Sequence, residues 1–275
     1  MELFNFLITV YIVLLLSRLF LPWGGELLFN PLLRTIARLT EPVLQPMRRF
    51  VPPTRTGFDL TPLVAAVLLV LVRGFLLGLS GGLDAKGAVL RSGLTLLNLC
   101  YGGAGILLLG VVFVSLGTAF SYSRFTQTML ALTDPIVHPL RRLIGYRERG
   151  LDWAPLLGMA VLIAARTAVV LSALRILGAS GPSATIRVVA LGSTYLLVDT
   201  LITFLMIVMI ARAIVSWINL DPSNPLVQAI IFFSDPILTP IRRAVPAWTL
   251  GLDFSPMFGV ILLMVVRYVV HRIVL

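Results

Sequence analysis

Apolar residues occur along this chain in long stretches that are too long for the core helices of a soluble fold. Six stretches come close to the ~20 residues that a helix needs to cross the hydrocarbon of a bilayer. They lie at residues 3–22, 62–80, 96–117, 155–177, 196–218 and 256–274. The pattern therefore predicts an all-α integral membrane protein with about six transmembrane helices.

Three of the connecting segments carry the same polar pattern at the same spacing. Each has an acid–proline pair, a second proline four positions later and an arginine pair two positions after that, followed by an aspartate and a proline seventeen and twenty positions after the first proline. The residues are Glu41, Pro42, Pro46, Arg48, Arg49, Asp59 and Pro62; Asp134, Pro135, Pro139, Arg141, Arg142, Asp152 and Pro155; and Asp235, Pro236, Pro240, Arg242, Arg243, Asp253 and Pro256. A register that recurs three times indicates one two-helix unit used three times, all in the same orientation, and predicts repeats at 1–85, 86–183 and 184–275.

The prolines and acids of these segments predict local helix boundaries. An acid followed by proline commonly ends one helix and begins another, and Thr61-Pro62 and Ser255-Pro256 have the form of an N-cap and first residue of the next span. The second proline falls where a continuous helix would need an amide, so each segment is expected to hold a short broken or re-entrant helix in the headgroup layer.

The arginine pairs allow two interpretations. Cations near the start of a short helix oppose its dipole, so something anionic should compensate them. Anionic lipid headgroups are one candidate. The other is the aspartate ten or eleven positions later, which would pin the segment against the start of the next span.

Charged residues inside the predicted spans form two further sets. Arg73, Arg166 and Arg267 each lie eleven residues after the proline that opens a span, which is near mid-bilayer, whereas Arg18 and Arg212 each precede an acid–proline proline by twenty-four residues. The middle repeat has Val111 at the latter position, and Asp199 is the one acid well inside a span. Bonding to backbone carbonyls, contact with a partner or lipid, and an ion path all remain open.

The net charge of +10 is concentrated in the three repeated segments. The positive-inside bias predicts that these loops are cytoplasmic and that both termini are periplasmic. The first span has no basic residue before it, so it is not expected to be a cleaved signal peptide. Cys100, His138 and His271 are too few and too scattered for a metal site, so neither a metal nor a cofactor is expected.

The third repeat closely resembles the YggT (YlmG) family of small bacterial and plastid membrane proteins. The positions that carry the resemblance are Arg212, Trp217, Asn224, Pro225, Asp235, Pro236, Pro240, Arg242, Arg243, Pro246, Asp253 and Pro256. The first repeat matches these positions well and the middle repeat in part. The resemblance implies a place in the bacterial inner membrane and links to cell division, envelope organisation and osmotic-stress tolerance, and it implies no catalytic residue.

Together these patterns favour a non-enzymatic scaffold or assembly factor. Its partners are expected to be anionic lipids and other membrane or division proteins, with homo-oligomers possible and no direct contact with nucleic acid. The alternative is a channel or transporter for a small ion or solute that uses the arginines inside the spans and Asp199. An intramembrane enzyme is disfavoured because no Ser/His pair or paired acids occur at a suitable spacing.

Overall fold

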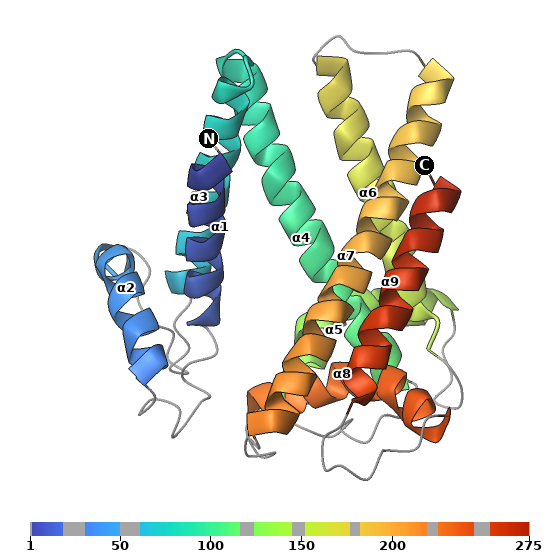
Figure 1. Ribbon diagram of the computed structural model, residues 1–275. Helices are drawn as coiled ribbons and strands as arrows, with labels where there is room; N and C mark the ends of the chain where they lie inside the picture. Colours follow the sequence, from blue (N-terminus) through green and yellow to red (C-terminus); the bar gives the residue numbers. More distant parts are fainter. Residues whose placement is uncertain are drawn as a thin grey trace. The chain divides into compact units, whose positions relative to one another are not determined.

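The computed structural model describes residues 2–18, 31–49, 61–115, 124–144, 152–176, 182–218, 225–244 and 254–274. Within these ranges the regular structure is helical throughout (Figure 1). The helices are α1 (Glu2–Ser17), α2 (Pro31–Met47), α3 (Thr61–Ser80), α4 (Ala85–Ser115), α5 (Arg124–Ile144), α6 (Ala154–Ile176), α7 (Pro182–Ile218), α8 (Pro225–Ala244) and α9 (Ser255–Val274). The predicted all-α class is confirmed.

Five of these helices, α3, α4, α6, α7 and α9, are long and apolar enough to cross a membrane. They are the helices of a multi-pass membrane protein, and each overlaps one of the predicted apolar stretches. The prediction of six spans is met only in part, because the described helix in the first stretch, α1, has 16 residues. Helices α4 and α7 are longer than expected, at 31 and 37 residues.

The chain packs as two units, Met1–Leu99 and Cys100–Leu275, whose boundary lies inside α4. In the first unit α1 and α2 pack against α3, and the small core includes Leu15, Leu44 and Ala65. In the second unit α7 packs against α6, α8 and α9, and a larger core surrounds Phe232 and Met209. The two units are defined by contacts, whereas the three predicted repeats are defined by recurring sequence. The boundaries of the repeats stay a prediction.

The starts of three spans agree with the sequence. Helices α3, α6 and α9 begin at Thr61, Ala154 and Ser255, so that Pro62, Pro155 and Pro256 are each the second helical residue. At this position proline loses no hydrogen bond, because the first amides of a helix have no carbonyl partner within it.

The expectation of broken helices in the repeated segments is wrong. Helices α2, α5 and α8 run through both prolines of each repeat, and the acid–proline pair lies in the helix interior rather than at its boundary. Prolines four positions apart lie on one face of a helix, so the backbone carbonyls that lose a partner are grouped there. Five of the six prolines are exposed, which leaves this face open to water or headgroups. These exposed prolines are Pro42, Pro46, Pro135, Pro139 and Pro240.

The expected conflict between the arginine pairs and the helix dipole is wrong for the same reason. Because the helices begin well before the acid–proline pairs, Arg141 and Arg142 lie in the last turn of α5, and Arg242 and Arg243 in the last turn of α8. Cations at the carboxyl end of a helix interact favourably with its dipole. No external anion is therefore needed to balance these charges against the helix.

Candidate functional site

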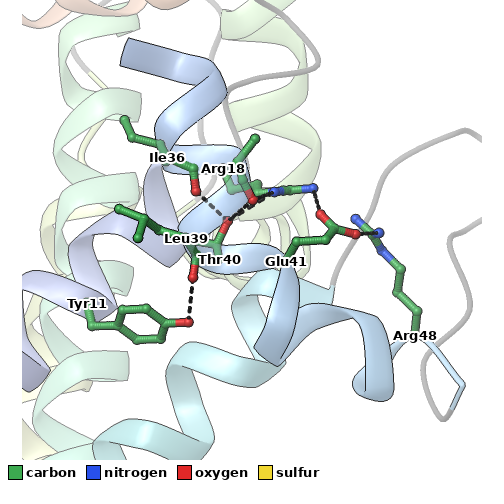
Figure 2. Close-up of polar contacts among 8 residues, drawn as sticks. Tyr11, Arg18, Ile36, Leu39, Thr40, Glu41 and Arg48 are labelled. Atoms are coloured by element: carbon green, nitrogen blue, oxygen red, sulfur yellow. Dashed lines mark hydrogen bonds and ion pairs between the residues drawn. The ribbon is translucent and has the colours of Figure 1, made fainter. Parts of the chain in front are cut away.

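A cluster of charges joins the end of α1 to α2 in the first repeat (Figure 2). The Glu41 carboxylate lies between two guanidinium groups, with Arg18 on Oε2 and Arg48 Nη1 at 2.5 Å from Oε1. Arg18 also donates hydrogen bonds to the Ala37 carbonyl at 2.7 Å and to Thr40 Oγ1 at 3.0 Å. Its side chain is only 15% exposed. Arg18 thereby ties the carboxyl end of α1 to the middle of α2.

The third repeat has the same charges at the same spacing. Arg212, Asp235 and Arg242 correspond in sequence to Arg18, Glu41 and Arg48. Burial raises the pKa of the Asp235 carboxyl above its ordinary value, although the positive charges of Arg212 and Arg242 act in the opposite direction. Both arginines therefore act electrostatically on this acid. The shared spacing is visible in the sequence. The spacing alone does not show that Arg18 and Arg212, in the spans before these helices, interact with Glu41 and Asp235.

The raised pKa of Asp235 predicts a pH effect on stability. Below the ordinary pKa of aspartate the carboxyl is protonated in both states, and the folded state keeps its proton to higher pH. The stability that Asp235 contributes is thus fully present in acid and is lost as the pH rises through the raised pKa. Thermal unfolding from about pH 4 to pH 7 should show this decline relative to Asp235→Asn. Parallel profiles for the two proteins would contradict it.

The middle repeat uses its charges differently. Val111 replaces the arginine of the span, Asp134 is exposed, and Arg141 turns to Asp152 instead. Arg141 Nε and Nη2 lie 2.8 and 2.7 Å from Asp152 Oδ2. Asp152 is only 2% exposed, and its Oδ1 accepts the Ala154 amide at 3.0 Å, which caps α6. The predicted pairing of an arginine with the later aspartate is therefore present here, whereas Asp59 and Asp253 of the other repeats lie outside the described residues.

The two arginines of each pair have different surroundings. The first, Arg48, Arg141 or Arg242, interacts with an acid of the chain as described above. The second, Arg49, Arg142 or Arg243, is exposed, and its side chain has no hydrogen-bond or ion-pair partner among the described residues. The Arg49 backbone amide donates to the Pro46 carbonyl. An exposed polar side chain, Gln45, His138 or Thr239, lies one turn before it. Helices α2, α5 and α8 are the amphipathic helices of the chain. Each therefore carries, in or just after its last turn, one arginine that pairs with the chain's own charges and one that is exposed.

A buried hydroxyl precedes the acid of every repeat. Thr40, Thr133 and Ser234 are at most 2% exposed, and each donates to a carbonyl three or four residues earlier. The Thr40 bond to Ile36 O measures 2.8 Å. Such bonds bend a helix slightly, and here they do so one turn before the prolines. The sequence showed a hydroxyl at this position three times, but spacing alone gave it no role.

The arginines at mid-span each have a side-chain partner on another helix. Arg73 Nε lies 2.6 Å from Asn5 Oδ1, and Arg166 Nη1 lies 2.6 Å from Ser193 Oγ. The guanidinium of Arg166 also stands over the Tyr101 ring, 5.5 Å from its centroid. Arg267 binds both carboxylate oxygens of Asp199, at 2.8 and 3.3 Å. Asn5 and Asp199 both precede their arginine by 68 positions.

The arrangement can bind anions and join helices. Among the described residues there is no group of three His, Cys, Asp or Glu side chains that could hold a metal ion. Arg18 and Arg48 pair with Glu41, and Arg141 pairs with Asp152, whereas the second arginine of each pair is exposed. These outward arginines are the groups best placed to meet a ligand.

Comparisons with known proteins find relatives of stated name but unstated function. The CCB3/YggT family matches the chain three times, at residues 1–80, 90–173 and 191–274. The uncharacterized protein YggT of Escherichia coli K12 is 30% identical over 146 residues, which is 53% of this chain and 71% of the relative. An uncharacterized protein of Pseudomonas aeruginosa is 28% identical over 158 residues, 56% of this chain and 79% of the relative. No solved structure matches the chain.

Proposed function

The chain belongs to the CCB3/YggT family, and we propose that it is a non-enzymatic scaffold or assembly factor that docks other membrane proteins through α2, α5 and α8. The observation that carries the proposal is the exposed second arginine at the end of each of these helices. Three equivalent cationic positions, one on each of these helices, make repeated contact sites.

The design of the helices supports this role. Ion pairs hold α2 and α5 in place through Arg18–Glu41 and Arg141–Asp152, so the backbone that carries the outer arginine is fixed before a ligand arrives. A preorganised group loses less conformational entropy on binding, which increases affinity. An exposed arginine also matches carboxylates and phosphates with two parallel hydrogen bonds.

Location and topology are part of the same proposal. A bacterial inner membrane would place the three helices at its cytoplasmic surface and both termini on the periplasmic side, in accord with the positive-inside bias. There the outer arginines would be attracted to acidic surfaces of partner proteins as well as to anionic lipids. Cell division, envelope organisation and osmotic-stress tolerance are the processes in which we propose that such docking acts.

A channel or transporter is the second candidate, and the mid-span charges are the observation that favours it. Arg73, Arg166 and Arg267 each have a partner, which supports a role in helix packing more than an open ion path. If the chain conducts an ion, Asp199→Asn should change flux in reconstituted vesicles. A flux equal to the leak of empty vesicles, for both wild type and variant, would count against conduction.

Photocrosslinking in cells tests the docking proposal. A photoreactive residue at Thr239, which is exposed one turn before Arg243, should give discrete protein adducts that mass spectrometry can identify. Arg243→Gln should remove these adducts, and the same probe at Ile214, exposed on α7, should not produce them. Adducts to lipid alone, or protein adducts unchanged by Arg243→Gln, would contradict the proposal.

A further inference from the structure

Helices α7 and α9 carry a row of polar side chains along the side where they meet. Asp199 and Tyr195 lie one turn apart on α7, and Arg267 and His271 lie one turn apart on α9. Arg267 binds Asp199, and the Tyr195 hydroxyl lies 3.1 Å from His271 Nδ1. The row is not buried, because the side chains of Arg267 and Asp199 are 44% and 22% exposed.

Arg267 lies at a depth where hydrocarbon should surround it. It is the thirteenth residue of α9, which places it about 18 Å along the helix and close to the bilayer centre. A guanidinium carries five N–H donors, and the two hydrogen bonds to Asp199 use two of them. The described residues offer no further acceptor to Arg267. A donor exposed to lipid tails without an acceptor is costly, so another group should cover it.

Helix α9 is also the least covered of the five long apolar helices. Only 11% of its apolar stretch is buried within the chain, compared with 39% for α4. Exposed apolar side chains on α9 include Met264, which lies one turn before Arg267, and Ile261, at 53% and 57% exposure. The surface therefore combines an incompletely satisfied charge pair with a broad apolar border.

We propose that a second copy of this chain packs on this α7–α9 surface, so that Arg267 of each copy also donates to Asp199 of the other. A two-fold axis along the membrane normal keeps both copies at the same depth. The same axis places Arg267 of one copy opposite Asp199 of the other, so the two charge pairs are complementary. Four charges then form a neutral cluster that is shielded from lipid.

A lipid headgroup fits this position less well. Phosphates lie at the edge of the hydrocarbon, whereas Arg267 is near its middle. The row of polar groups also includes the Tyr195–His271 bond, which offers further hydrogen-bonding positions to a protein neighbour at the same depth. This inference concerns a surface other than the amphipathic helices and does not depend on the docking role proposed for them.

Cysteine crosslinking in native membranes tests the dimer. Cys100 is the one cysteine of the sequence, so Cys100→Ser gives a background in which each introduced thiol is unique. Met264→Cys is the test position and Leu262→Cys the matched control, since they are similarly exposed, at 53% and 48%, and similarly deep. They point about 160° apart around the helix. Oxidation should give a disulfide-linked dimer at least about tenfold more abundant for Met264→Cys.

Charge variants decide whether the cluster drives the contact. In the Met264→Cys background, Arg267→Gln should reduce the dimer, because glutamine still reaches Asp199 within one copy but brings no cation to the other. The exchange Arg267→Asp with Asp199→Arg keeps the pair within each copy and should restore the dimer. Equal crosslinking at positions 262 and 264, no dimer at either, or a dimer that Arg267→Gln does not reduce would overturn the proposal.

Discussion

Replacing Arg141 with glutamine is expected to destabilise the protein by about 3 kcal/mol, because it leaves a buried carboxylate without its cation. Asp152 is 2% exposed, and Arg141 Nε and Nη2 both contact its Oδ2. The loss also disturbs the start of α6, since the same carboxylate caps the Ala154 amide. Unfolding in mixed detergent micelles with increasing SDS, followed by far-UV circular dichroism, would measure the change.

The double variant Arg141→Gln/Asp152→Asn is the control for this effect. Asparagine retains an oxygen for the Ala154 amide and carries no charge, so the double variant should be more stable than Arg141→Gln alone. If both variants lose the same stability, the ion pair is not the source of the effect. Arg142→Gln, which changes the exposed neighbour, should be close to neutral.

Replacing Gly78 with alanine is expected to separate α3 from α4 and to cost about 2 kcal/mol. A Cβ at Gly78 would lie 2.7 Å from the Ala88 Cα and 2.9 Å from its Cβ. These atoms belong to the backbone and to a side chain with no rotamer, so the clash is relieved only if a helix moves. Such a movement would also strain the bond from Ser92 Oγ to Leu71 O, which measures 2.9 Å.

Gly93 provides the comparison for this prediction. It lies in α4, where a Cβ would meet no atom within 4 Å. Alanine at this position should therefore be neutral or stabilising by up to about 1 kcal/mol, as expected from helix propensity. The same SDS unfolding measurement applies to both variants. Equal stabilities for Gly78→Ala and Gly93→Ala would show that the close approach of α3 and α4 does not determine stability.

Helix positions were predictable because hydrocarbon imposes a length and a composition on whatever crosses it. The predicted stretches at 62–80, 155–177 and 256–274 differ from α3, α6 and α9 by one residue at most at each end. Their prolines, such as Pro62, also marked the starts. Spacing of small residues alone does not determine helix packing, because Gly74 and Gly78 make close contacts, whereas Ala160, Ala164 and Ala168, at the same spacing, are exposed.

The interiors of the amphipathic helices could not be predicted from proline placement. Pro135 and Pro139 were interpreted as helix breakers, but grouping both lost hydrogen bonds on one exposed face allows α5 to continue. Whether a helix tolerates proline depends on where the freed carbonyls point, and that depends on the tertiary position of the helix.

Partners of the charges were predictable only over short distances. The pairing of Arg141 with Asp152 spans eleven positions and was one of two interpretations of the arginine pairs. The contact of Arg18 with Glu41 spans 23 positions, and that of Arg267 with Asp199 spans 68. These contacts depend on how helices pack against each other. The sequence signal that could have indicated these contacts is the recurrence of the same separations, 23 and 68 positions, in the first and third repeats.

The length of α7 sets how far the protein extends beyond the hydrocarbon. Its 37 residues make a rod of about 55 Å, and a tilt of about 40° would still leave it rising roughly 42 Å through a layer of ~30 Å. The carboxyl end of α7 leads toward α8, so the surplus turns are available at its amino end, where Arg187 is exposed. One continuous rod then connects the two aqueous phases, and a load applied at either surface would be carried to the other without a flexible joint.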